Sequence, residues 1–568
     1  MKQNLPLYNV PHIKSIQDLL LRSAKEYKDK IALEDLTNYP ISKLTYSQLY
    51  ENVIKFGKAL IKIGIKERDH IAVIGDNRVQ WGITYLSAMC FNLVIVPIDK
   101  NLNQNEILNI LHESDAKAVI FSEAFEQLFA EKKHSLLHLK YYIGMDILSD
   151  GDEFYSMPGM ITDQKDTDVK LPEIIPEDFS EIIFTSGSLG RAKGVMLSQK
   201  NLAANLMAMT SMIEIRQNDR FLSVLPMHHT YECTCGFLCP LFAGGSAHYA
   251  RSLRTVVEDL QNVKATILLG VPLLYDKMFK RIYKSIKEDK IKSKIVPPLI
   301  KITNLIANIG WEGAKRKVFK ELHNQFGGSI RLFIAGGAAP DPKVAKGLRE
   351  FGFCFVQGYG LTETAPILTL NRLDNFKDDS AGLPLPGVQV KINEPDDEGI
   401  GEIYVKGDNV MPGYYKNQKL TDDSFTDGWF KTGDLGCFDE DGFLHISGRK
   451  KNVIIANNGK NVFPEEIEDI LNRHSFVLES MVYGEKNEKH DEIIAVQIVI
   501  DAEAFIEYSE KNFVEITPEL INEKMSEVIK EVNKELSSYK QIRKFYIREN
   551  EFEKTTTQKI KRYLVSNK

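Results

Sequence analysis

A loop rich in small hydroxylated residues lies between two apolar runs at 182–198, where the chain reads IIFTSGSLGRAKGVMLS. Glycine accepts positive φ and lets backbone N–H groups approach a ligand closely. Successive N–H groups in such a turn form a concave nest for phosphate oxygens. Hydroxyls and one lysine would complete an anion site built from Thr185, Ser186, Gly187, Ser188, Gly190 and Lys193. The pattern indicates a phosphate-binding loop, although a surface turn between strands has a similar composition.

The spacing of residues in this loop differs from that of the Walker A phosphate loop, G-x-x-x-x-G-K-[ST]. Counting from Gly187, the second required glycine is Ala192. The residue after Lys193 is Gly194, so no hydroxyl stands where that motif holds Mg²⁺. The choice between another kind of phosphate loop and a plain turn therefore depends on the rest of the chain.

A second motif, QGYGLTETAP, occupies 357–366. Glycines on both sides would let Tyr359 lie flat against a planar ring. Thr362 and Glu363 place a hydroxyl and a carboxylate side by side, which suits a phosphate and its Mg²⁺. Taken alone, Glu363 could equally be a surface charge.

Two shorter motifs follow, KTGD ending at Asp434 and GRKK beginning at Gly448. A carboxylate beside a glycine can accept hydrogen bonds from both hydroxyls of a ribose. Each motif also has an ordinary reading, with Asp434 as a turn cap and Arg449 in a surface ion pair.

Composition and charge exclude several classes of protein. The chain has 568 residues, which is more than one domain's worth, with 43% hydrophobic and 26% charged residues. Its net charge of −6 carries no basic footprint and argues against nucleic-acid binding. The first residues lack the apolar core of a signal peptide, and no apolar stretch reaches membrane-spanning length. We expect a cytoplasmic protein.

The elements that must position these motifs alternate between helices and strands. A helical pattern covers 46–65, and short apolar runs predict buried strands at 70–75, 94–98, 117–121, 266–270 and 331–335. Strands interleaved with helices predict an α/β fold with a mostly parallel sheet covered on both faces. Shorter, turn-rich strands between Gly382 and Gly448 predict antiparallel structure. After Arg449, helices near 464 and 518–536 and strands at 480–483, 493–500 and 544–548 predict a small α+β domain.

Together and in this order, the motifs resemble those of the adenylate-forming enzymes, which include acyl-CoA synthetases, nonribosomal peptide adenylation domains and firefly luciferase. The resemblance covers nearly the whole chain through FTSGSLGRAKG, GGAAP (336–340), GYGLTE, FKTGDLG, GRKKNVIIANNGKNVFPEEIE and TTTQKIKR (555–562). The chain departs from the family pattern at Leu189, Ala192 and Gln558, where the family usually has threonine, proline and glycine.

The resemblance implies an architecture and a set of roles. The architecture is a large layered domain with a distorted antiparallel barrel-like part (1–449) and a small mobile lid domain (450–568). Lys559 would serve adenylation, Lys451 would be the hinge, and Gly459 would let a pantetheine arm pass. The phosphate loop would hold the β- and γ-phosphates of ATP, Glu363 the Mg²⁺ and Thr362 the α-phosphate. Adenine would contact Tyr359, Gly337 and Ala338, and the ribose would contact Asp434 and Arg449.

The stretch 225–245, LPMHHTYECTCGFLCPLFAGG, is similar to that of long-chain acyl-CoA synthetases. His229 would lie at the mouth of the acyl pocket, unless it is a core histidine, and the small residues 233–236 would form a helical wall of that pocket. The implied acceptor is CoA, with acyl carrier protein as the alternative. A non-catalytic nucleotide-binding protein on the same fold is a further alternative.

A basic, amphipathic segment spans 277–320, with thirteen Lys and Arg against three acidic residues inside it and Glu321 directly after it, and with interleaved isoleucines and leucines. Such a segment can lie on an anionic bilayer or dock an acidic protein. A solvated helical face is the other interpretation.

Overall fold

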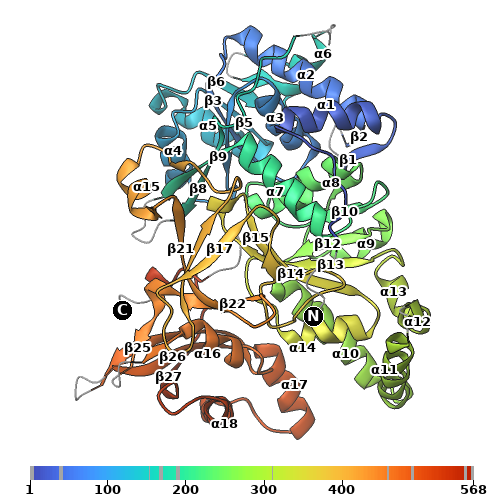
Figure 1. Ribbon diagram of the computed structural model, residues 1–568, viewed down its shortest axis with the longest axis vertical. Helices are drawn as coiled ribbons and strands as arrows, with labels where there is room; N and C mark the ends of the chain where they lie inside the picture. The colour runs from blue at the N-terminus through green and yellow to red at the C-terminus, as the bar shows by residue number, and fades with distance from the viewer. Residues whose placement is uncertain are drawn as a thin grey trace. The chain divides into compact units, whose positions relative to one another are not determined.

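The protein is described here from a computed structural model (Figure 1), which describes residues 6–37, 42–151, 154–164, 170–186, 192–309, 311, 313–456, 460–487, 492–555 and 560–564. The chain divides into two compact units. The first comprises Met1–Gln389 and Val405–Phe430, and the second comprises Val390–Tyr404 and Lys431–Lys568. Packing thus groups 431–449 with the C-terminal residues, while the expected functional boundary at 449/450 stays a prediction.

One sheet of the first unit has eight strands in the described part of the chain, in the order β19-β9-β8-β4-β3-β5-β6-β7. Neighbouring strands from β8 to β7 run parallel, whereas β9 pairs antiparallel with β8 and with β19. The strands are β3 (His70–Ile74), β4 (Val94–Ile98), β5 (Ala118–Phe121), β6 (Tyr141–Gly144), β7 (Tyr155–Ser156), β8 (Phe179–Ser186), β9 (Ala192–Ser198) and β19 (Gly413–Tyr414). The helices of this part are α2 (Tyr46–Ile63), α3 (Val79–Cys90), α4 (Gln104–Glu113), α5 (Glu126–Lys132) and α6 (Met157–Thr162).

Helix α2 shows how local signals set the element bounds. Thr45 caps its start in a reciprocal capping box with Gln48. Gly64 ends it in the left-handed conformation, with φ 113°, which glycine adopts without a steric penalty. The helix predicted over 46–65 is therefore confirmed, apart from its last two residues.

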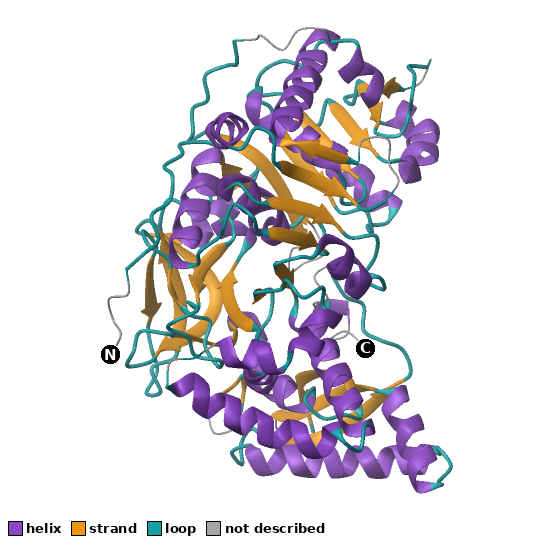
Figure 2. Ribbon diagram, turned by 90° about the vertical axis from the view of Figure 1, so that its right-hand side faces the viewer, coloured by secondary structure: helices purple, strands orange, loops and turns teal. Residues whose placement is uncertain are grey.

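A second sheet of the first unit has nine strands among the described residues, in the order β16-β15-β14-β13-β12-β10-β11-β1-β2. It is parallel except at its ends, where β15, β16 and β2 pair antiparallel. Its strands are β1 (Ile31–Asp35), β2 (Lys43–Thr45), β10 (Arg220–Ser223), β11 (Ser246–Tyr249), β12 (Ile267–Gly270), β13 (Leu332–Ala335), β14 (Cys354–Gly360), β15 (Ile367–Leu370) and β16 (Leu383–Pro384). Helices flank the strands of this unit (Figure 2): α1 (Ile16–Glu26), α7 (Gln199–Met212), α8 (Cys239–Ala243), α9 (Val256–Val263), α10 (Pro272–Glu288), α11 (Lys292–Asn308), α12 (Gly313–Val318), α13 (Lys320–Gln325) and α14 (Pro342–Glu350).

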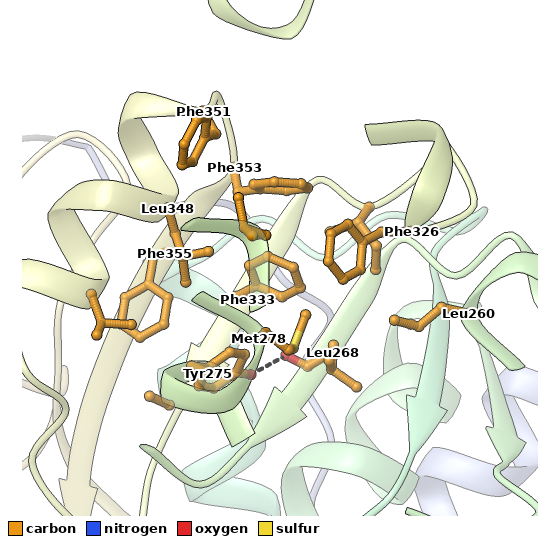
Figure 3. Packing of buried hydrophobic residues seen from close by; sticks show 14 of the residues in the cluster. Leu260, Leu268, Tyr275, Met278, Phe326, Phe333, Leu348, Phe351, Phe353 and Phe355 are labelled. Atoms are coloured by element: carbon orange, nitrogen blue, oxygen red, sulfur yellow. Dashed lines mark hydrogen bonds between the residues drawn. The ribbon is translucent and has the colours of Figure 1, made fainter. Parts of the chain in front are cut away.

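An aromatic core supports this second sheet (Figure 3). Phe333 on β13 and Phe355 on β14 belong to one cluster with Phe353 and with Tyr275 on α10. The Tyr275 hydroxyl donates to the carbonyl of Leu268 on β12 at 2.9 Å, so its polar end is satisfied inside an apolar cluster. This packing joins β12, β13 and β14, and expected site residues lie at or beyond the ends of β13 and β14.

The second unit contains the antiparallel structure and the small α+β part. An antiparallel ladder joins β21 (Trp429–Phe438) to β22 (Leu444–Arg449), in a sheet that also includes β17 (Gln389–Asn393) and β18 (Gly401–Lys406). Beyond it, a three-stranded sheet packs with three helices through one buried cluster. These elements are β25 (Val477–Lys486), β26 (Glu492–Ile500), β27 (Ile542–Arg548), α16 (Pro464–Leu471), α17 (Ala502–Asn512) and α18 (Pro518–Glu535). The predicted fold class, a mixed α/β protein with a large parallel-sheet domain and a smaller C-terminal domain, is confirmed.

Candidate active site

The loop predicted to bind phosphate connects β8 to β9, which pair antiparallel with Thr185 opposite Lys193. Ser186 is the last residue of β8, while Gly187, Ser188 and Gly190 lie outside the described residues. The Thr185 hydroxyl is buried and has no hydrogen-bond partner among the described residues. A buried hydroxyl without a partner costs free energy, so a ligand oxygen at this position would be favourable.

Glu363 lies in a tight turn that follows β14. The turn contains a short 3₁₀ segment, η4 (Thr362–Thr364), and folds back so that the Leu361 N–H donates to the carbonyl of Pro366 at 3.0 Å. A side chain at Gly360 would overlap the Pro366 carbonyl, so this position requires glycine for close backbone approach. Glu363 is 8% exposed, and Thr362 beside it is half-buried.

The turn brings Glu363 against the lysine of the phosphate loop. Lys193 Nζ lies 2.6 Å from Glu363 Oε1. Lys193 also donates to the hydroxyl of Tyr414 at 2.8 Å, and that hydroxyl donates to Glu363 Oε1 at 3.0 Å. Burial by itself would raise the pKa of Glu363, but the charge of Lys193 and the hydrogen bonds from Lys193, Tyr414 and the backbone together outweigh it, and the pKa lies below its usual value. The carboxylate is therefore ionised at neutral pH.

This carboxylate suits a magnesium ion that also binds a nucleotide. No group of three or more His, Cys, Asp or Glu side chains in the described ranges gathers to hold a metal ion. Mg²⁺ is commonly held by one or two carboxylates together with substrate phosphates, so a single Glu363 beside a phosphate loop fits this mode. The ion would neutralise phosphate charge.

The residues expected around adenine lie at the carboxyl ends of adjacent parallel strands. Ala335 on β13 pairs with Gln357 on β14, so Gly337 and Tyr359 each follow that pair by two residues. Gly337 has φ 87°, Ala338 is exposed, and Tyr359 is half-buried. Ligands of parallel α/β sheets bind at this edge of the sheet. The structure thus brings these three residues to one edge.

The expected ribose residues belong to the second unit. Asp434 on β21 is opposite Arg449 on β22, and Arg449 Nε lies 2.6 Å from Asp434 Oδ1. Asp434 is only 4% exposed, and its N–H donates to the Thr432 hydroxyl at 3.1 Å. The two residues therefore form one ion pair on one ladder. Their role toward a ribose stays a prediction.

The stretch expected to form the acyl pocket adopts a π-helix, η3 (Tyr231–Leu238), which continues into α8. His229 is half-buried and precedes it, with its ring 4.3 Å from the ring of His228. Burial lowers the pKa of His228 to about 3, so that ring stays neutral. The Tyr231 hydroxyl donates to the Ile334 carbonyl at 3.1 Å, which places the start of η3 beside the end of β13.

Three other expected site residues are placed less completely. Gly459 and Lys559 lie outside the described residues, so their roles stay predictions. Lys451 is part of a short 3₁₀ segment, Lys450–Asn452, directly after β22. Its neighbour Lys450 makes a 2.8 Å ion pair with Glu402 of the same unit. A hinge role for Lys451 stays a prediction.

Sequence reasoning missed Tyr414, which contacts both charged residues of the site. Its pairing partner on β9 is Val195, more than two hundred residues earlier in the chain. The segment MPGYY at 411–415 has no periodic signal, and only the pairing of β19 with β9 brings Tyr414 to Lys193.

Within the described parts of the chain, no helix has the length and apolarity needed to cross a bilayer.

The layered, mostly parallel sheets of the first unit and the small α+β part of the second define a class of α/β proteins that bind ligands at the carboxyl edge of the sheet. Within that class, the chain belongs to the AMP-binding enzyme family. The family model described as "AMP-binding enzyme" matches residues 20–415, and the model of the AMP-binding enzyme C-terminal domain matches residues 466–559. The family predicted from the motifs is thereby confirmed.

Relatives and solved structures agree with this assignment. The chain is 26% identical to the long-chain-fatty-acid–CoA ligase FadD15 of Mycobacterium bovis, over 98% of this chain and 95% of the relative. It is 27% identical to the chloroplastic long-chain-fatty-acid–[acyl-carrier-protein] ligase AEE15 of Arabidopsis thaliana, over 85% of this chain and 76% of the relative. Its fold is similar to that of ATP-bound MatB from Rhodopseudomonas palustris, with a TM-score of 0.76, 24% identity, and 97% and 98% of the two chains covered.

Proposed function

We propose that this protein is an AMP-forming acid–thiol ligase that activates a fatty acid. In the first step, a carboxylate oxygen of the acid attacks the α-phosphorus of ATP and pyrophosphate leaves, which gives an acyl-adenylate. In the second step, a thiolate attacks the acyl carbon and AMP leaves, which gives a thioester. The observation that carries the proposal is the pair formed by Lys193, at the start of β9, and Glu363, with Nζ 2.6 Å from Oε1.

Each site residue has a role in that first step. Thr185, Ser186 and Lys193, together with the loop residues Gly187, Ser188 and Gly190, would hold the β- and γ-phosphates. Glu363 would hold Mg²⁺, and Thr362 the α-phosphate. Such chemistry depends on positioning and charge neutralisation, and both are supplied by preorganised groups.

The contacts proposed for adenine and ribose, and the role proposed for Lys559, follow from the family resemblance. Tyr359, Gly337 and Ala338 would contact adenine, and Asp434 with Arg449 would hold the ribose. Lys559 would neutralise charge that develops between the carboxylate and the α-phosphate. A rotation of the C-terminal domain about Lys451 would then remove Lys559 and bring Gly459 to the pantetheine arm.

The proposed acid is a long-chain fatty acid and the proposed acceptor is CoA. Support comes from the relative FadD15, a long-chain-fatty-acid–CoA ligase by name, whose similarity extends over nearly the whole chain. His229 at the entrance of the buried η3 segment is the proposed mouth of the acyl site. The name of the relative AEE15 favours acyl carrier protein as the second candidate acceptor.

The basic segment suggests a place for the enzyme to meet its substrate. Helix α11, at the edge of the first unit in Figure 1, has one side packed on the core through Val296, Leu299 and Ile300. Ile291 (69% exposed) and Leu305 (67% exposed) add apolar surface among the lysines of the segment. We propose that this surface contacts an anionic lipid layer peripherally, since a basic surface with exposed apolar residues suits that partner.

Two measurements test the proposed function. ATP–pyrophosphate exchange that depends on a fatty acid reports the first step, and thioester yield with CoA or acyl carrier protein, across chain lengths, identifies the acceptor. The Lys559→Ala variant should lose exchange and keep thioester formation from supplied acyl-adenylate. Absence of fatty-acid-dependent exchange in the unaltered protein would refute adenylation, and equal loss of both steps in the variant would refute the role of Lys559.

A further inference from the structure

The segment 408–415, which we call the strap, joins the two halves of the charged site. It follows β18 and leads through α15 (Gln418–Ser424) to β21. The strands on either side contribute residues to the second unit, whereas the strap itself belongs to the first unit. Because the strap belongs to a different unit from most of its flanking strands, its position depends on its own contacts within the first unit.

The first half of the strap binds the turn that carries Glu363. The Met411 N–H donates to the Glu363 carbonyl at 2.9 Å. The Asn409 amide donates to the carbonyls of Thr364 and Ile367 at 3.0 and 3.1 Å. One side chain of the strap is therefore bonded both to the turn, at Thr364, and to the first residue of β15 after it.

Helix α7 supports this half of the strap from the other side. The Asn201 amide donates to the strap carbonyls of Asp408 and Val410 at 2.7 and 2.9 Å. One helical turn later, the Asn205 amide donates to the Ile367 carbonyl at 2.7 Å, the same oxygen that Asn409 reaches. Asn205 is fully buried and Asn409 is 2% exposed, so these bonds are made away from water.

The second half of the strap binds the strand that carries Lys193. Gly413 and Tyr414 pair with β9, and the Tyr415 N–H donates to the Gly194 carbonyl at 2.8 Å. The Tyr414 hydroxyl then contacts both Lys193 Nζ and Glu363 Oε1, and Lys193 lies 4.5 Å from the centre of the Tyr414 ring. Tyr414 is only 5% exposed.

We propose that Asn409 and Tyr414 are positioning residues for adenylation, and that the strap sets the place of Lys193 relative to Glu363. This inference rests on the proposed function. Both charged groups must meet phosphate oxygens and a metal ion whose positions tolerate little error. Lys193 and Glu363 come from segments 170 residues apart, and the strap hydrogen-bonds to the segments that carry both. Within the described part of the chain, Tyr414 is the partner that Lys193 has besides the carboxylate it must share with the ion.

The test uses Tyr414→Phe, with Tyr415→Phe as its matched control. The first removes the hydroxyl that contacts Lys193 and Glu363 and keeps the ring and the strand pairing. The second removes the neighbouring hydroxyl on the same strap, which donates to Asp115 at 2.6 Å near the surface. We expect Tyr414→Phe to lower kcat of pyrophosphate exchange roughly ten- to hundredfold and to raise the Mg²⁺ concentration at half-maximal rate. Tyr415→Phe should leave both values unchanged.

Asn409→Ala provides an independent variant, measured with the same exchange assay and with thioester formation from supplied acyl-adenylate. Exchange should fall at least roughly tenfold while the thioester step stays within about twofold of the unaltered protein. Equal effects of the two tyrosine variants, or a parallel loss of both half-reactions in Asn409→Ala, would overturn the inference. If the unaltered protein lacks exchange activity, the proposed function fails instead, so the two failures are distinguishable.

Discussion

Glu232 makes the stability of the first unit depend on pH. It lies in η3 and is 1% exposed, and burial outweighs the lowering effect of the Ser223 hydroxyl on its pKa. Gly236 leaves the space that this carboxyl fills, because a side chain there would overlap it. Burial raises the pKa of Glu232 to about 8 from an ordinary value of 4.5, so the native protein keeps it neutral at pH 7.

The sign of the effect follows from proton linkage. Between pH 4.5 and 8 the unfolded chain releases this proton and the native protein retains it, so the free energy of unfolding falls as pH rises. Each pKa unit corresponds to about 1.4 kcal/mol, so the full loss reaches about 5 kcal/mol once the pH exceeds 8. Glu232→Gln keeps the side-chain volume and cannot ionise, so it should escape this loss.

Thermal unfolding of the two proteins at matched scan rates measures the difference. Near pH 4.5, the Tm of the variant should be close to that of the unaltered protein. Between pH 5 and 8.5, the Tm of the variant should rise by several degrees relative to that of the unaltered protein. Burial also raises the pKa of Glu181 to about 8, but that residue is present in both proteins and cancels. Glu440→Gln, at an exposed turn, is the control. A Tm difference that is the same at pH 5 and pH 8.5 would refute the reasoning.

Three further predictions concern the site and the basic segment. Glu363→Gln should lower turnover about a hundredfold with little change in Tm, because it removes the charge that faces Lys193 and the ion; an unchanged rate at saturating Mg²⁺ would exclude the metal role. Gly360→Ala should distort the Glu363 turn and lower the rate of pyrophosphate exchange at least about tenfold. The control is Gly151→Ala, where an added side chain meets no neighbouring atom, and this variant should keep the exchange rate of the unaltered protein. Equal activity of both variants would show that the turn tolerates a side chain. Reversal of Lys284, Lys287, Lys290 and Lys294 to Glu should weaken binding to anionic vesicles, at about 1 kcal/mol per lysine, and spare activity on a short soluble acid. Unchanged vesicle binding with a higher KM for acyl carrier protein would point to protein docking, and no change in either would leave a solvated face.

The sequence by itself determined the fold class and the family of this protein and predicted its site residues. Buried strands appear as apolar runs, and β4 covers the same residues, 94–98, that the pattern predicts. Helix α16 begins at Pro464 as expected, since proline is favoured in the first turn. The motifs predicted Lys193, Glu363 and Asp434 because each motif combines a glycine-rich turn with a charged side chain within a few residues. These signals are local, so they can be read without knowing what packs against them.

Only the tertiary structure decided which distant segments meet. Tyr414 reaches Lys193 through a two-residue strand pairing, and Asn205 and Asn409 converge on one carbonyl from segments about 200 residues apart. The high pKa of Glu232 likewise depends on everything that buries it. Side-chain periodicity records whether a residue is buried, and it carries no information about its neighbours. Pairing register and buried electrostatics are instead properties of the whole packed chain, because each contact is favourable only when the rest of the fold holds both partners in place.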